Sequence, residues 1–472
     1  MEKREDLETI LPYLPLKIQD SSLSWPSPHL VEVLEAMTKG PSHSRVDSGQ
    51  TLSDFISDMR QALSLTCHLS SSSLEGYALY FDERMSKEES IRWFNEVLPA
   101  MACLLLRFPY LLELHYLNSD NLINGTKTGL RVLGPKKDGI VFLSQELIGA
   151  LLSCSFFCLF HVDNRGSNHL PIINFDKLFG SLINTGRNEH QENKIKCITH
   201  YFQRLSSCIP PGFVSFERKI LTLEKDSSGL EAFPDEGFWR NSTVKLCPVE
   251  VHTYGLIEDQ SVEALEVDFA NKNLGEIRFM INPELIVGML FLPTMEVNEA
   301  IEVVGAERFS HYTGYASSFR FFGDYIDTKE TDVFGRRTTR IVAIDALRHP
   351  GVSQYKPESL LSKALCIDHE DGVGVATGNW GCGAYGGDPE IKSLLQWLAV
   401  SQARRPFMSY YTFGFEALHN LNQVTELVVS KGWTVGYLWK NLVKYSNQRL
   451  KNKKRREPKL GLFDWLTSIK SS

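Results

Sequence analysis

The chain has 472 residues, more than one ordinary domain needs, and this length predicts two or three domains. Apolar residues make up 43% and charged residues 23%, a balance typical of a soluble protein with a large buried core. The net charge of -7 argues against a protein whose whole surface binds nucleic acid. The nine cysteines are scattered without metal-ligand spacing, so we expect a reducing compartment, no disulfide framework and no metal site.

Three segments of the chain indicate where in the cell the protein is located. The N-terminal stretch MEKREDLETILPYLPL is charged and lacks the apolar core of a secretory signal. The longest apolar run, Leu147–Phe160, is too short to cross a bilayer, so we expect no membrane segment. Residues Arg449–Lys459 are rich in Lys and Arg, which fits either a solvated helix end or a nuclear-localisation or polyanion-contacting segment. We expect a monomer in the nucleus and/or cytoplasm.

The first 210 residues favour helices. Residues 1–85 form a predicted N-terminal extension, partly irregular because prolines interrupt it, with a loop at Ser70–Ser73. Apolar residues then recur at helical spacing, and this periodicity predicts a helical accessory domain over 86–210. Its expected helices are Ser86–Leu117 with prolines punctuating it, Leu143–Phe160, and two within Asn174–Arg204, of which the second begins at Asn193.

Residues 211–446 favour an α/β fold. Short β-rich runs alternate with two expected helices, Pro283–Leu290 and Pro389–Ser401, and this alternation predicts a layered domain around a mixed sheet. The expected strands are Val214–Leu223, Thr243–Leu246, Leu265–Ala270, Ala300–Phe309, Arg340–Leu347, Val373–Thr377 and Phe407–Phe413. Residues 447–472 form the expected basic C-terminal tail.

The stretch Glu266–Leu292 places polar groups near one strand end. Asp268 lies within a predicted strand, Asn271 follows it and Glu276 comes after a short turn. Asn282-Pro283-Glu284 then has the composition of an N-cap, a first-turn proline and a first-turn acid. Strand ends are where α/β folds hold ligand chemistry, although on this stretch alone a plain strand, turn and capped helix is the better explanation.

A second stretch, Val375–Gln402, is rich in glycine and leads into a helix that Asp388 caps with Pro389 at its first position. Such a turn can bring backbone N–H groups and a helix N-terminus to a phosphate. It matches neither the P-loop pattern nor the dinucleotide fingerprint. A tight corner explains some of the glycines, whereas Trp380 and Tyr385 among them suggest aromatic walls around a ligand.

Two aromatic segments complete the candidate site. Tyr315 follows a glycine in a loop after a predicted strand, and Phe413 closes the strand that contains Tyr410 and Tyr411. Aromatic-rich loops usually pack rather than bind. Rings beside a phosphate cradle would nevertheless suit a nucleotide diphosphate, with stacking for the base and N–H groups for the pyrophosphate.

Together these stretches resemble the poly(ADP-ribose) glycohydrolase family. The matching strings are VDFAN, EIRFMINPELIVGMLF, GAERFSHYTGYASSFRF, RIVAIDAL, VATGNWGCGAYGGD and YYTFG. The resemblance implies a macrodomain-like α/β/α sandwich with a mixed sheet, preceded by a mostly α-helical accessory domain. It also implies hydrolysis of the ribose–ribose O-glycosidic bond of poly(ADP-ribose), with release of ADP-ribose and without a cofactor. The implied partners are poly(ADP-ribose) and the proteins that carry it, without sequence-specific nucleic-acid binding.

The resemblance also assigns roles to single residues. Glu276 takes the place of the catalytic glutamate, and Asp268 and Asn271 those of residues that hold the ribose and the catalytic loop. The remaining positions match substrate-binding residues: Ile257 and Glu258 the adenine-contacting pair, Tyr315 the tyrosine over the ligand, Gly381, Cys382, Gly383, Ala384 and Tyr385 the diphosphate loop, and Phe413 the aromatic on adenine.

The sequence departs from the family pattern before Glu276. The family signature has a triple-glycine loop and a Gln-Glu-Glu between VDFAN and IRF, whereas here VDFANKNLG runs directly into EIRF. Three hypotheses follow: a working glycohydrolase, a catalytically impaired homologue that binds ADP-ribose without cleaving, or a sequence that lacks coding residues between Leu274 and Glu276.

Overall fold

The chain is described by a computed structural model that divides into two compact units. Unit 1 comprises Met1–Glu217, Asn273–Thr294 and Val303–Thr338, and unit 2 comprises Arg218–Lys272, Met295–Glu302 and Thr339–Ser472. The structure describes residues 4–65, 68–163, 165, 170–184, 189–220, 224–225, 231–232, 236–260, 262–270, 278–296, 298–346, 348–356, 372–455 and 460–469.

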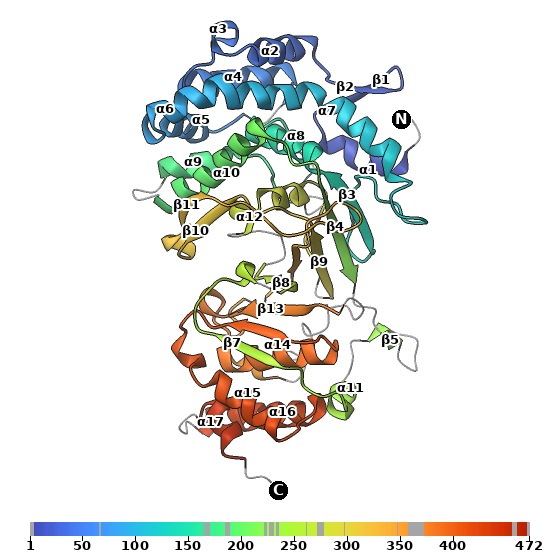
Figure 1. The fold of residues 1–472 in the computed structure, drawn as a ribbon, viewed down its shortest axis with the longest axis vertical. Coiled ribbons are helices and arrows are strands. Elements are labelled where there is room, and N and C mark those ends of the chain that lie inside the picture. The colour runs from blue at the N-terminus through green and yellow to red at the C-terminus, as the bar shows by residue number, and fades with distance from the viewer. Residues whose placement is uncertain are drawn as a thin grey trace. The chain divides into compact units, whose positions relative to one another are not determined.

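Unit 1 is largely helical (Figure 1). Its helices of eight or more residues are α2 (Pro28–Thr38), α4 (Gly49–Ala62), α5 (Ser71–Leu79), α7 (Leu98–Ser119), α8 (Gln145–Phe156), α9 (Asp176–Asn184), α10 (Glu189–Ser207) and the 3-10 helix η6 (Pro283–Leu290). Shorter elements are α1 (Glu5–Ile10), α3 (Pro41–Ser44), α6 (Lys87–Arg92), α12 (Arg278–Ile281), the hairpin β1 (Lys17–Gln19) and β2 (Ser22–Ser24), and β3 (Gly139–Ser144).

Two local expectations for unit 1 were wrong, because serines that looked like loop or helix-interior residues are helix caps. The N-terminal 85 residues contain regular helices, α2, α4 and α5 among them. Ser70, expected in a loop, caps α5 by accepting a hydrogen bond from the backbone N–H of Ser73. Ser144 caps α8, so the helix expected from Leu143 begins at Gln145 after strand β3.

The helix expected over Ser86–Leu117 is present and continues through its prolines. It runs from Lys87 to Ser119, with a five-residue π-helical stretch at Trp93–Val97, and Pro109 lies inside it. In the described part of the chain this helix is long and apolar enough to cross a membrane, by length and composition alone. Half of its most apolar window is buried, and α7 packs against α2 and α8, as a core helix does.

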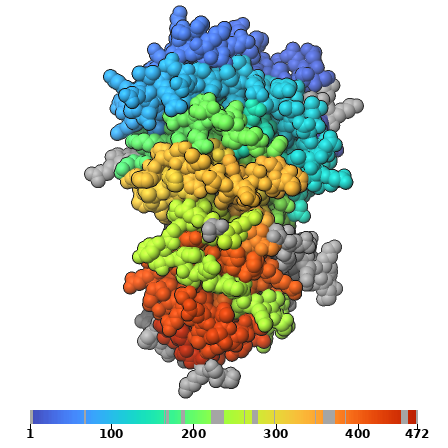
Figure 2. Space-filling view, viewed as in Figure 1, coloured from blue at the N-terminus to red at the C-terminus, as the bar shows by residue number. Residues whose placement is uncertain are grey.

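Unit 2 is built on parallel strands. One eight-stranded sheet has the order β3-β4-β9-β12-β8-β13-β14-β7, and its last five strands run parallel. Figure 2 shows yellow-green residues of the β7 region beside orange residues from much later in the chain, in agreement with the β14–β7 pairing. The strands not yet bounded are β4 (Phe213–Ile220), β7 (Val249–His252), β8 (Ala264–Asp268), β9 (Glu299–Val304), β12 (Arg340–Ala343), β13 (Gly374–Gly378) and β14 (Met408–Tyr411).

The expected α/β fold with a mixed sheet is confirmed, with some strands shifted. The strand expected at Thr243–Leu246 was wrong: among these residues only Lys245 forms a bridge, and the strand of the sheet is β7. Asn282 precedes η6 as expected, but its side chain caps nothing and donates to the carbonyl of Ala306 instead. Tertiary contacts outcompeted the local cap in this case.

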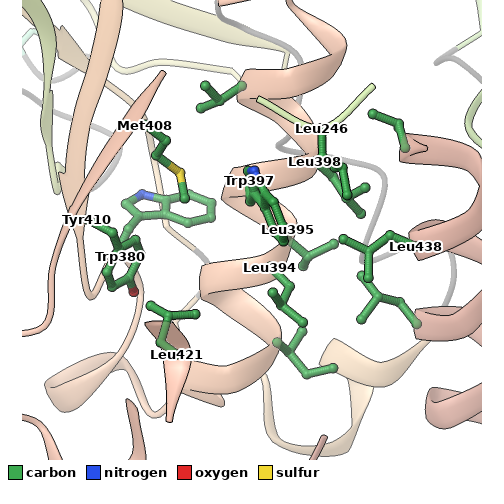
Figure 3. Close-up of a cluster of buried hydrophobic side chains, with 14 of the residues drawn as sticks. Leu246, Trp380, Leu394, Leu395, Trp397, Leu398, Met408, Tyr410, Leu421 and Leu438 are labelled. Carbon is green, nitrogen blue, oxygen red and sulfur yellow. The ribbon is translucent and has the colours of Figure 1, made fainter. Parts of the chain in front are cut away.

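The core of unit 2 lies between one sheet face and helix α14 (Pro389–Gln402). In Figure 3, Leu394, Trp397 and Leu398 of α14 lie among side chains from other elements, including Met408 and Tyr410 of β14. The helices α11 (Glu236–Asn241), α15 (Leu421–Ser430), α16 (Val435–Arg455) and α17 (Leu462–Thr467) contribute to the same cluster. The Trp397 indole also donates to the carbonyl of Cys247, which satisfies its N–H group inside the core.

A buried ion pair joins β4 to β9. The Arg218 guanidinium contacts the Glu299 carboxylate, and both side chains are fully buried. Burial lowers the pKa of Arg218, and the neighbouring Glu299 charge opposes that shift. A buried pair of this kind adds modestly to stability when intact, yet leaves a costly uncompensated charge when one partner is removed.

Glu299→Ala is therefore expected to lower the free energy of unfolding by about 3–5 kcal/mol, because it removes the carboxylate that faces the buried Arg218 guanidinium. The matched control is Glu96→Ala, which breaks the exposed Arg92–Glu96 pair and should cost less than about 1 kcal/mol. Urea unfolding of both variants checks this, and equal losses would contradict the buried-pair argument.

A second buried polar cluster holds η6 inside unit 1. Glu284 is fully buried, and its carboxylate accepts from the side-chain amide of Gln145 at 2.8 Å and from the backbone N–H of Glu307 at 2.7 Å. Burial raises the pKa of Glu284 to about 8, against the effect of these two hydrogen bonds. The folded protein therefore keeps a proton on Glu284 at a pH where the unfolded chain has lost it.

This proton gives stability a defined pH dependence. The Glu284 contribution is complete below the usual glutamate pKa near 4.5 and is lost as the pH rises through about 8. Glu284→Gln cannot titrate, so wild type should lose stability relative to this variant between pH 5 and pH 9. Urea unfolding at several pH values measures the difference, and parallel curves for the two proteins would refute the assignment.

Candidate functional site

Four parallel strands of unit 2 end at one edge of the sheet. The segments that follow these strands form the candidate site. The register places Gly378 beside Tyr411 and Tyr411 beside His252, so β13, β14 and β7 end level with one another. β8 ends at Asp268 and pairs in parallel with β13. Segments that follow these strands therefore start close together, as ligand sites in open α/β sheets do.

Asp268 is the last residue of β8 and is 5% exposed. Its backbone carbonyl accepts from the N–H of Ile344 at 3.5 Å, which ties the strand end to the segment after β12. Asn271 and Glu276, the other two polar residues predicted for this stretch, lie outside the described residues. Their expected roles stay predictions.

The predicted adenine-contacting pair lies in η5 (Ile257–Asp259), a short turn over the sheet. Ile257 and Glu258 are each 7% exposed, and Ile257 packs with Ala264, Ala376 and Tyr411. Gly255 precedes the turn with a φ of +100°, and a Cβ there would lie 3.1 Å from the Tyr411 ring. The turn therefore reaches the strand ends because residue 255 has no side chain.

The glycine-rich loop after β13 is closed by its own backbone. The N–H of Gly387 donates to the carbonyl of Gly381 at 3.0 Å, and a Cβ on Gly387 would lie 2.4 Å from that oxygen. Asp388 caps α14 as predicted, accepting from the N–H groups of Glu390 and Ile391. A tight corner thus explains Gly387, whereas Gly383 borders open space, because a Cβ there would meet no atom within 4 Å.

Three side chains tie this loop to neighbouring elements. Asn379 donates to the carbonyl of Thr412 at 3.0 Å, and Gln396 of α14 donates to the carbonyl of Gly378 at 3.1 Å. The Trp380 indole, expected as a ligand wall, is 6% exposed and donates to the carbonyl of Ile344. The expectation for Trp380 was wrong, because the ring is part of the core beneath the loop.

Cys382 and Tyr385 of the loop are both partly buried. Cys382 is partly buried, and burial raises the pKa of its thiol to about 12. The thiol is therefore neutral near pH 7, which excludes a thiolate nucleophile at this position. The ring of Tyr385 lies 5.5 Å from the Arg348 guanidinium carbon, and the side chain of Ala384 is outside the description.

Lys392 is a residue of this site that sequence reasoning missed. It is 4% exposed, and its Nζ lies 4.5 Å from the centre of the Trp380 ring. Its Cε and Nζ lie 3.5 Å and 3.7 Å from the position of a Cβ on Gly381. A buried cation therefore supports the loop from below. The sequence signal for Lys392 was its position in the first turn of α14, which directly follows the glycine-rich loop.

Phe413 presents an exposed ring at the end of β14. It is 46% exposed, has a φ of +51°, and its ring edge lies 2.9 Å from the position of a Cβ on Gly378. The Phe269 ring lies 3.3 Å from the same point. Gly378 thus lets two aromatic rings approach the end of β13, and unit 2 brings Phe413 to the edge that carries Asp268 and the glycine-rich loop.

Tyr315 belongs to unit 1, in the hairpin of β10 (Ser310–Thr313) and β11 (Arg320–Asp324). It is 63% exposed and directly precedes the 3-10 turn η7 (Ala316–Ser318). A Cβ on Gly314 would lie 2.0 Å from the carbonyl oxygen of Ser318, so the tight turn requires glycine there. The hairpin therefore exposes the Tyr315 ring. In the described ranges of both units, no three His, Cys, Asp or Glu residues gather as a metal site would require.

Comparisons with known proteins agree with this architecture. The family model described as "Poly (ADP-ribose) glycohydrolase (PARG), helical domain" matches residues 85–218, and the one described as "Macro domain fold" of the same family matches residues 236–420. The chain is 52% identical to "Poly(ADP-ribose) glycohydrolase 1" of Arabidopsis thaliana, over 99% of this chain and 97% of that protein. It is 50% identical to "Probable poly(ADP-ribose) glycohydrolase 2" of the same organism, over 100% of both chains.

The class of protein is therefore a glycosidase-type hydrolase with a helical domain followed by a macrodomain-fold domain. The chain belongs to the poly(ADP-ribose) glycohydrolase family. The first Arabidopsis match extends over 552 aligned positions, more than the 472 residues of this chain, so the relative has residues that this chain lacks.

Lys392→Met should weaken binding of ADP-ribose, the ligand that the resemblance implies, because it removes the cation under the glycine-rich loop. We expect a loss of about fivefold in affinity, the size of one partly desolvated charge contact of about 1 kcal/mol. Isothermal titration calorimetry measures it. Lys440→Met, an exposed substitution on α16, is the control, and equal affinities for the two variants would exclude a role for Lys392.

Proposed function

We propose that this protein hydrolyses the ribose–ribose O-glycosidic bond of poly(ADP-ribose) and releases ADP-ribose. The observation that supports this most directly is the convergence, at one edge of unit 2, of Asp268, the η5 turn, the glycine-rich loop and Phe413. The family membership of the chain supports the same reaction.

The arrangement fits the parts of an ADP-ribose group. The exposed Phe413 ring offers a stacking surface for adenine, and the η5 turn with Ile257 and Glu258 lies over the neighbouring strands. The open backbone at Gly383 would let the diphosphate approach the loop closely. Tyr315, the tyrosine that the resemblance assigns to the ligand, has an exposed ring on its hairpin in unit 1.

The chemistry requires an acid at the leaving ribose oxygen. In the proposed reaction Glu276 donates a proton to that oxygen as the glycosidic bond breaks, and its carboxylate then takes a proton from the water that attacks the anomeric carbon. Asp268, buried at the end of β8, would hold the ribose and add a neighbouring negative charge. Burial and a neighbouring carboxylate both favour the protonated form of a glutamate.

The second candidate function is binding without cleavage. One observation favours it: only KNLG separates Asn271 from Glu276, where the family signature has a triple-glycine loop and a Gln-Glu-Glu. A catalytic group displaced by about 1 Å can lose roughly a hundredfold in rate. The proposed binding residues Phe413 and Gly381–Tyr385 lie elsewhere in the sequence and are present in this chain.

Incubation of the full chain with poly(ADP-ribose) tests the proposal, with ADP-ribose release followed by chromatography. We expect release that Glu276→Gln abolishes, because the amide cannot donate the proton. We also expect a rate about a hundredfold below that of the Arabidopsis relative assayed in parallel, because the residues that precede the catalytic glutamate in the family signature are absent here. The matched control is Glu263→Gln, an exposed carboxylate one residue before β8, which should leave the rate unchanged.

The other outcomes separate the candidates. Calorimetric binding of ADP-ribose without any release would replace hydrolysis with the binding function. Release that persists in Glu276→Gln would refute the role of this glutamate, and neither binding nor release would refute both functions. Genomic DNA and transcripts across the codons for Leu274–Glu276 show directly whether a coding stretch is missing.

A further inference from the structure

Unit 2 contains a cavity that none of the predicted site residues lines. It has a volume of about 340 Å³ and lies on the face of β7 and β14 that carries Glu250, His252, Ser409 and Tyr411, with Asp259 and Gln260 on its other wall. Ile257, Glu258 and Phe413 are not among its lining residues. A cavity of this size accommodates a small molecule.

The register of two parallel strands builds its floor. Ser409 lies beside Glu250, and Tyr411 lies beside His252, so the four side chains share one face of the sheet. The His252 and Tyr411 rings stack with centres 4.7 Å apart. Gln260 donates a hydrogen bond to the Tyr411 hydroxyl, which ties the opposite wall to the floor.

Two polar atoms at the cavity make no hydrogen bond with a described residue. Ser409 is 1% exposed, and its hydroxyl makes no hydrogen bond with any described residue. The buried Nε2 of His252 likewise has no hydrogen-bond partner in the described part of the chain, and lies 3.7 Å from the Glu250 carboxylate. An unsatisfied buried polar group is costly to the folded protein, so a ligand that pairs with it gains affinity.

The charge around the cavity is negative. Glu250 and Asp259 line it, and neither Lys nor Arg does among the described residues. Burial raises the pKa of the Tyr411 hydroxyl, and the nearby carboxylates of Asp259, Glu258, Glu250 and Glu266 raise it further. This charge disfavours phosphate and therefore distinguishes the cavity from a site for the diphosphate of a nucleotide.

We propose that this cavity binds a small organic cation through an ammonium or guanidinium group. The cationic head would lie between the Glu250 and Asp259 carboxylates and donate a hydrogen bond to the Ser409 hydroxyl. An ammonium or guanidinium group supplies both the positive charge and the N–H donors that these acidic and hydroxyl groups attract. The apolar part of the ligand would lie against the stacked rings of His252 and Tyr411. This inference does not depend on the proposed hydrolase activity.

Calorimetric titration of the full chain with agmatine and with spermidine tests the inference, and inorganic phosphate serves as the anionic probe. We expect an amine to bind, more weakly at high salt, and phosphate not to bind. The double variant Glu250→Gln/Asp259→Asn should weaken amine binding at least tenfold. The exposed Glu416→Gln, on the short turn after β14, is the control and should bind as wild type does.

Ser409→Ala separates ligand binding from folding. The hydroxyl makes no hydrogen bond with a described residue, so its loss should leave thermal stability unchanged or slightly raised, while amine affinity falls several-fold. The inference is overturned if no amine binds, if the acidic double variant binds equally well, or if phosphate binds instead. Competition between the amine and ADP-ribose would also overturn it, because the cavity would then be part of the nucleotide site.

Discussion

The parallel register of β8, β13, β14 and β7 is the constraint on which the rest of unit 2 depends. Parallel strands end at a common edge, so residues from four distant parts of the chain meet there. A shift of one residue in β14 would turn Ser409 and Tyr411 toward the α14 core and bring Met408 and Tyr410 to the other face. The candidate nucleotide-binding edge and the acidic cavity both depend on the pairing of β14 with β13 and β7.

The glycine-rich loop shows how the core supports a surface site. Its backbone is closed on itself, and Asn379, Gln396 and Trp380 tie it to β14, α14 and the end of β12. Lys392 places a buried positive charge beneath it, whereas the cavity beside η5 is lined by carboxylates. Unit 2 therefore separates opposite charges on one sheet, which favours phosphate at the loop and cations at the cavity.

Sequence patterns correctly predicted the elements whose limits depend on residues close together in the chain. Asp388 with Pro389 correctly marked the start of α14, and the β-rich runs located most strands of the sheet. The same reasoning failed where tertiary contacts decide: Asn282 donates to Ala306 rather than capping η6, and the strand near Thr243 lies later, at β7. Trp380 resembled a ligand wall because sequence does not show which face of a loop is buried.

The sequence by itself determined the family, the α/β fold with its helical domain, and the cap and glycines that shape the loop after β13. These depend on residue types at fixed local spacing. Only the tertiary structure decided that Lys392 lies under the loop and that Ser409 and His252 line an acidic cavity. The physical reason is that burial, unpaired polar atoms and the sum of neighbouring charges arise from residues far apart in the chain.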